Sequence, residues 1–176
     1  FATMRITFNA FTISFLPAFG FSVAASALTG QALGAHQPDR ARLATLVALR
    51  SAAVWMTSMA VICFVASEPL LRVFTDDPAV ITAGVEALRV GALSIPIWSI
   101  PMVLAGALRG AGDTRFPMTS NLIGGWLLRL PLGYLLAIVV GLGLPGAYLA
   151  FAADAAAQSV MVGWRYRRGK WREIRV

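Results

Sequence analysis

Long stretches without a charged residue constrain this chain more than any other feature of its sequence. The first runs from Ile6 to Ala35, and its roughly 30 residues at 1.5 Å each would give a helix of about 45 Å. Two more uncharged runs follow at Ser51–Ser67 and Val90–Leu108. A helix needs only about 20 apolar residues to span a bilayer. The pattern predicts several transmembrane helices, the first of which must tilt, bend or extend past the hydrocarbon core.

The composition agrees with a membrane protein. The chain is 58% hydrophobic and 13% charged, well above the apolar content of a typical soluble domain. A net charge of +7 raises the question of nucleic-acid binding. The basic residues, however, stand at the ends of apolar runs and in the C-terminal tail, where no soluble fold would present a binding face. We therefore expect no nucleic-acid partner and a lipid bilayer as the surroundings.

The apolar runs and the turns between them predict an all-α membrane protein with five transmembrane helices. A basic cytoplasmic tail would follow at 167–176. Prolines inside helices remove a backbone hydrogen bond and crowd the preceding turn, so Pro17 should bend the first helix, and Pro96 and Pro101 should bend or break the third. The expected spans are approximately 6–34, 38–66, 79–108, 116–140 and 144–166.

The segment 109–115 joins two of these runs through a short charged connection. Gly110 and Gly112 permit backbone conformations closed to other residues, and Asp113 or Thr114 can cap the next helix. Arg109 and Arg115 flank the turn and suit a cytoplasmic face, where basic residues accumulate.

The same charge bias orients the whole chain. The connections at 36–42 and 109–115 and the C-terminal tail are rich in arginine, whereas the connection at 68–78 is mostly acidic. Five spans would then place the C-terminus inside and the N-terminus outside.

Two charges fall where the predicted spans cannot bring them to a surface. Counted from the cytoplasmic ends of their helices, Arg129 and Asp154 both lie roughly 20 Å deep. A charge at that depth normally faces the bundle interior and finds a partner, so we expect Arg129 and Asp154 to approach each other directly or through water. Gln158 stands one turn from Asp154 on the same face. The pair can act as a structural clamp or can serve ion coupling or substrate binding.

Ser22, Ser26 and Thr29 recur at helical spacing in the first run and form a narrow face of small polar residues. Such a face permits close helix packing, and it can also form one wall of a watery pathway.

Enzyme chemistry and bound cofactors are not indicated. The chain has no phosphate-binding P-loop motif and no nucleophile with a placed base. The single cysteine, Cys63, excludes an internal disulfide, and the single histidine, His36, stands in a polar connection without another histidine or cysteine to complete a metal site. No metal site is therefore expected.

Four stretches together resemble the multidrug and toxic compound extrusion (MATE) family of transporters. LRGAGDTRFP, at 108–117, is similar to a cytoplasmic connection late in each half of that family. The segments at 28–35, 71–78 and 126–132 (LTGQALGA, LRVFTDDP and WLLRLPL) fit in the same order. Members have twelve helices in two related bundles of six. The resemblance therefore implies that this chain corresponds to the last five helices of a larger protein.

The resemblance also implies a function. MATE proteins are secondary antiporters that export organic, often cationic, compounds against an inward sodium or proton gradient by alternating access. On this reading the chain is multi-pass in a bacterial inner membrane, with the remaining helices and a small organic substrate as partners and sodium or a proton as the coupling ion. Two alternatives stay open: a related flippase of lipid-linked sugars, and a non-transporting scaffold or remnant.

Overall fold

The computed structural model describes residues 2–73, 77–169 and 171, and in these residues it contains helices and connecting turns but no strand. The chain begins with two long helices that pack against each other, α1 (Ala2–Gly34) and α2 (Pro38–Val65). The turn between them places His36 at φ 57°, and Pro38 then opens α2, where its missing N–H leaves no bond unmade. Helix α1 continues through Pro17 without interruption.

The third predicted span is two helices. After the short α3 (Ser67–Arg72) come α4 (Pro78–Ala92) and α5 (Ile95–Gly110), and the parts of α4 and α5 on either side of the break meet at 44°. Pro96 stands in the first turn of α5, directly after the break, as its missing N–H leads one to expect. Pro101 lies inside α5, which continues past it. The connection at 74–76, part of the resembling segment 71–78, lies outside the described residues.

The fourth helical rod changes its winding along its length. It consists of α6 (Arg115–Leu122), the π-helical segment η1 (Ile123–Arg129), α7 (Leu130–Tyr134) and a second π-helical segment, η2 (Leu135–Val139). Two glycines with positive φ, Gly141 and Gly143, then reverse the chain into α8 (Gly143–Arg167). After α8 the backbone turns at Gly169, and Trp171 stacks on Tyr166 with ring centroids 4.9 Å apart. The other residues of the predicted tail after 169 lie outside the described part.

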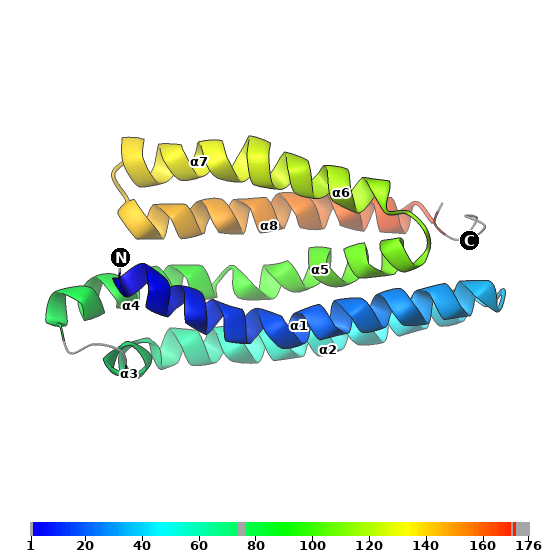
Figure 1. Ribbon diagram of the computed structural model, residues 1–176, viewed down its shortest axis with the longest axis horizontal. Coiled ribbons are helices and arrows are strands. Elements are labelled where there is room, and N and C mark those ends of the chain that lie inside the picture. Colours follow the sequence, from blue (N-terminus) through cyan, green and yellow to red (C-terminus); the bar gives the residue numbers. More distant parts are fainter. Residues whose placement is uncertain (1, 74–76, 170, 172–176) are drawn as a thin grey trace.

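The helices run roughly along one axis in successive layers (Figure 1). Helix α5 lies between the α1–α2 pair and α8, and α8 in turn separates α5 from the rod formed by α6 and α7. Alanine dominates the buried positions, including Ala25, Ala52, Ala107 and Ala155. Small side chains let helix backbones approach closely, which is how helices associate when lipid removes the hydrophobic driving force between them.

The helices begin and end close to the predicted limits, but they do not all qualify as spans by length and composition. Within the described residues, Thr12–Gly34, Pro38–Val65 and Arg115–Val139 qualify alone, and the bent pair formed by α4 and α5 makes a fourth. Helix α8, the fifth predicted span, is not among them, and it carries the buried acid Asp154. Its assignment as a span therefore rests on its packing between α5 and the α6–α7 rod.

Candidate functional site: a buried carboxylate beside a polar cavity

Asp154 is the most deeply buried charged residue described, with 1% of its side chain exposed. It lies on α8 where that helix packs against η1. The side-chain amide of Gln158, one turn along α8, donates to Asp154 Oδ1 at 2.7 Å. Gly124 of η1 supplies the space, because a β-carbon there would collide with Asp154 Oδ1 and lie 2.7 Å from Gln158 Nε2. The absence of a side chain at position 124 thus admits the polar group between the two helices.

Arg129 approaches this carboxylate from the end of η1. Its Nη1 lies 3.7 Å from Asp154 Oδ2, and its guanidinium carbon lies 5.5 Å from the centroid of the Phe151 ring. Arg129 and Asp154 thus approach each other as predicted. Their contact is an ion pair without a hydrogen bond. Arg129 keeps 44% of its side chain exposed, and among the described residues Asp154 Oδ2 accepts no hydrogen bond. Asp154 Oδ2 is therefore buried and has the Arg129 guanidinium as its charged neighbour.

A cavity of about 400 Å³ opens beside this cluster between α1, α5, α6 and α8. Gln158 lines the cavity and also bonds Asp154, whereas Asp154 itself lies behind Gln158 and is not part of the cavity wall. Arg109 Nη2 donates to Ser22 Oγ at 3.3 Å, and Ser22 Oγ donates to the carbonyl of Met102 at 2.7 Å. Arg109 thus reaches into the bundle as well as flanking the turn. The polar residues of the wall are Ser22, Arg109, Thr114, Asn121 and Gln158.

The small polar face of α1 serves close packing, and at one position it also lines the cavity. Gly106 and Gly110 of α5 lie against the backbone of Ser22 and Ser26, so closely that a β-carbon on either glycine would collide with it. Thr29 turns towards α2 and shares a hydrogen bond of 3.2 Å with Thr45. The first of the two readings is thus observed for Ser22, Ser26 and Thr29. A role of these residues in a transport pathway stays a prediction.

Pro101 leaves one backbone carbonyl of α5 without its helical hydrogen bond, and the structure shows which side chain on another helix contacts this carbonyl. Because proline has no N–H, the carbonyl of Ile97, four residues earlier, loses its helical donor. The hydroxyl of Ser159 on α8 shares its proton between this carbonyl, at 3.3 Å, and the carbonyl of Ala155 in its own helix, at 2.7 Å. The proline therefore creates an acceptor on the surface of α5 that joins it to α8.

The connection between α5 and α6 is tied to the end of α8. Asp113 is 7% exposed, and its Oδ2 accepts a hydrogen bond from Arg165 Nε at 2.7 Å. Its other oxygen accepts a long bond, 3.4 Å, from the amide of Phe116, so Asp113 caps α6, whereas Thr114 makes no capping bond. The sequence predicted Asp113 or Thr114 as the cap. It did not predict the bond to Arg165, because no local pattern links positions 52 residues apart.

The two glycines of this connection play different roles. Gly112 has φ 84°, as expected for a turn that only glycine adopts easily. Gly110, in contrast, is the last residue of α5. The prediction that it adopts a turn conformation closed to other residues is wrong. Its small size serves the contact with Ser26 described above.

Comparison with known proteins supports one family. The MatE family model matches residues 1–135. A "Probable multidrug resistance protein NorM" of Thermotoga maritima is 32% identical over 171 residues, covering 97% of this chain and 37% of the relative. The NorM multidrug resistance protein of Burkholderia vietnamiensis is 31% identical, covering 94% and 37%. The chain thus spans a little over a third of the length of these relatives.

Two solved structures share the fold. The chain superposes with a TM-score of 0.87 on an inward-facing conformation of a multidrug resistance MATE family transporter of the MOP superfamily, at 21% identity, over 93% of this chain and 37% of that one. An outward-facing conformation of such a transporter also gives a TM-score of 0.87, at 16% identity, over 98% and 39%. Since the MatE model covers most of the sequence and the helices superpose over nearly all of it, this chain belongs to the MatE family of membrane transporters.

Proposed function

We propose that this chain forms part of a secondary active antiporter that exports organic, often cationic, compounds by alternating access, driven by a sodium or proton gradient. The relatives that it matches are named as multidrug resistance proteins. Its helices superpose equally well, with a TM-score of 0.87, on an inward-facing and an outward-facing transporter. This equality supports a unit that keeps its internal packing while the transporter changes its overall conformation.

The observation that carries the proposal is the buried carboxylate of Asp154, whose Oδ2 accepts no hydrogen bond from the described residues and whose Oδ1 accepts one from Gln158, a residue of the wall of a polar cavity. Membrane helices rarely retain a charge at such a position unless it serves a pathway, an ion or an essential partner. The pairing with Arg129 supplies the partner, and a coupling cation would compete with Arg129 for the same oxygen, Oδ2.

Transport assays on the full-length protein test this proposal. In proteoliposomes with an imposed sodium or proton gradient, we expect a fluorescent organic cation to be exported, with no requirement for ATP. Asp154→Asn should leave the folded yield near normal and reduce export if the carboxylate couples transport. A proportional loss of yield and export would assign Asp154 to the structure alone. No export under either gradient would refute the proposal.

We further propose a bacterial inner membrane as the location, with the 109–115 connection in the cytoplasm. The arginines of this connection and of the end of α8 support that side. Single-cysteine labelling in a Cys63-free background tests it, and position 114 is suitable because Thr114 is exposed whereas Asp113 is buried. Labelling of position 114 from outside intact cells would reverse the orientation. In the proposed membrane location, lipid and the remaining helices of the transporter cover the exposed face of the α6–α7 rod.

A further inference from the structure

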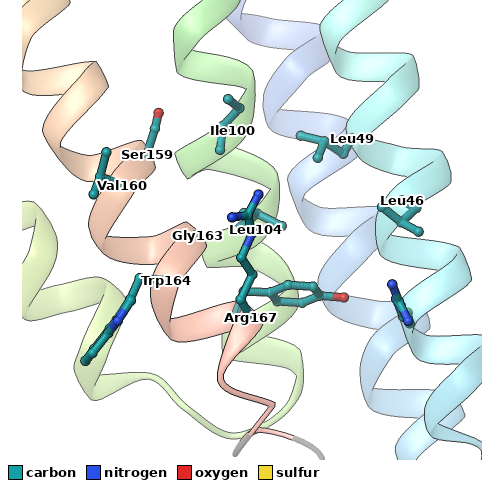
Figure 2. Close-up of a pocket in the computed structure, with 11 residues that line it drawn as sticks. Leu46, Leu49, Ile100, Leu104, Ser159, Val160, Gly163, Trp164 and Arg167 are labelled. Carbon is teal, nitrogen blue, oxygen red and sulfur yellow. The ribbon is translucent and has the colours of Figure 1, made fainter.

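A second cavity lies on a different side of α5 from the Asp154 cluster. It has a volume of about 830 Å³ and is formed by α2, α5 and α8. Apolar residues of three helices line this groove (Figure 2): Leu46 and Leu49 on α2, Ile100 and Leu104 on α5, and Val160 and Gly163 on α8. Its upper walls are thus apolar, apart from Ser159, whose single hydroxyl proton is shared between backbone carbonyls of α8 and α5.

Two arginines line the groove where α2 begins and α8 ends. Arg42, near the start of α2, and Arg167, the last residue of α8, both line it. Each lies seven residues from the farthest apolar residue of its own helix, so the apolar part extends roughly 10 Å along the helix axes from the α-carbons of the two arginines. Figure 2 shows the side chain of Arg167 turned into the groove from the end of α8. Neither arginine has an ion pair within the described part of the chain.

The groove therefore combines an apolar channel with a doubly cationic mouth. This end carries the arginine-rich connections, so the orientation proposed above puts it at the cytoplasmic leaflet, where anionic lipids gather. Arginine binds phosphate oxygens through paired N–H donors, and two guanidinium groups disfavour an organic cation in the same place. An occupant that matches both parts has a phosphate at one end and hydrocarbon at the other.

We propose that the groove between α2, α5 and α8 binds an anionic phospholipid of the cytoplasmic leaflet, with its phosphate between Arg42 and Arg167 and the first part of an acyl chain along Leu46, Leu104 and Val160. The site lies apart from the Asp154 cluster and does not depend on what the protein transports. The proposed site recognises both the negative charge of a lipid headgroup and the acyl chain attached to it.

Native mass spectrometry of the full-length protein in mild detergent tests the proposal. Phosphatidylglycerol is titrated against phosphatidylethanolamine and, separately, inorganic phosphate. We expect phosphatidylglycerol to bind preferentially. The double substitution Arg42→Gln/Arg167→Gln should weaken its binding about twenty- to thirtyfold, because each arginine near an anionic headgroup contributes roughly fivefold.

Two further variants separate the parts of the site. Arg40→Gln/Arg168→Gln removes the same charge from neighbouring positions that do not line the groove, and it should weaken binding much less than the groove pair does. Gly163→Leu adds a side chain where a β-carbon would meet no other atom within 4 Å, so it should fill the groove without disturbing the helices. We expect this variant to keep its thermal transition and to lose phosphatidylglycerol.

The outcomes are distinct. Equal loss in both arginine pairs would show general surface charge and overturn the site. Two results would show a site for phosphate that does not bind an acyl chain, and would refute the proposal that a lipid is the ligand. One is unchanged lipid binding in a folded Gly163→Leu protein, and the other is full competition of inorganic phosphate with the lipid. Equal binding of phosphatidylethanolamine would overturn the headgroup recognition.

Discussion

Replacing Arg129 by alanine should destabilise the bundle more than replacing Asp154, although the two side chains form one pair. The reason is their unequal burial: Asp154 is 1% exposed and Arg129 is 44% exposed. Without Arg129, a buried carboxylate keeps only the amide of Gln158 as a partner. Without Asp154, a long and half-exposed side chain can turn outwards while it keeps its contact with Phe151.

The geometry sets the expected sizes. Two unit charges about 4 Å apart attract by about 4 kcal/mol at an effective dielectric constant of 20, and the exposure of Arg129 reduces this to a coupling of about 1–2 kcal/mol. Leaving a buried charge without its partner costs about 3 kcal/mol or more, so this is the loss expected for Arg129→Ala. Asp154→Ala instead leaves the Gln158 amide without an acceptor, at a cost of about 1–3 kcal/mol. The double variant should lose about 3 kcal/mol, less than the sum of the two.

Denaturant titration of the four full-length proteins in detergent micelles, followed by tryptophan fluorescence, measures these free energies of unfolding. Arg115→Ala is a matched control, because it removes an exposed arginine from the same helical rod and should change the stability by no more than about 0.5 kcal/mol. Losses that add within about 0.5 kcal/mol would refute the coupling. A larger loss for Asp154→Ala than for Arg129→Ala would refute the argument from burial.

Three more outcomes can be checked by thermal unfolding of the full-length protein. Gly106→Val should lower the stability by about 2 kcal/mol or more, because its β-carbon would collide with α1, whereas Gly20→Val, which meets nothing within 4 Å, should not; equal effects would contradict the close packing. Ser159→Ala should lower the free energy of unfolding by about 1 kcal/mol. The loss should be smaller in a Pro101→Ala background, because the N–H at position 101 can then donate to the Ile97 carbonyl within the helix. The same loss in both backgrounds would show that the bond from Ser159 to Ile97 contributes nothing. Asp113→Ala should cost about 2 kcal/mol by leaving Arg165 without its acceptor, whereas Thr114→Ala should cost little; equal losses would argue against the tie to α8.

The sequence predicted the helical rods because their signals are local. Uncharged runs of sufficient length, prolines, and glycine-rich turns depend only on neighbouring residues, and the helices accordingly begin and end near the expected positions. The break before Pro96 was likewise readable from a missing N–H. The π-helical winding of η1 was not, since no residue type specifies it and its packing against Asp154 involves a distant helix.

The candidate site divides in the same way. That Arg129 and Asp154 would meet followed from the sequence, because two charges at equal depth in consecutive membrane helices have few other ways to find a partner. The gap of 3.7 Å, the unequal exposure of the two side chains and the space left by Gly124 did not follow.

The sequence alone determined which segments are helical, where they turn and which charges must be paired, since these depend on spacing and on the cost of an unpaired charge in an apolar medium. Only the tertiary structure decided which helix faces touch. It placed Asp113 against Arg165, Ser159 against the carbonyl freed by Pro101, and both Arg42 and Arg167 along one groove. These contacts join residues far apart in the chain, and their positions depend on how closely glycine and alanine let the helices approach one another.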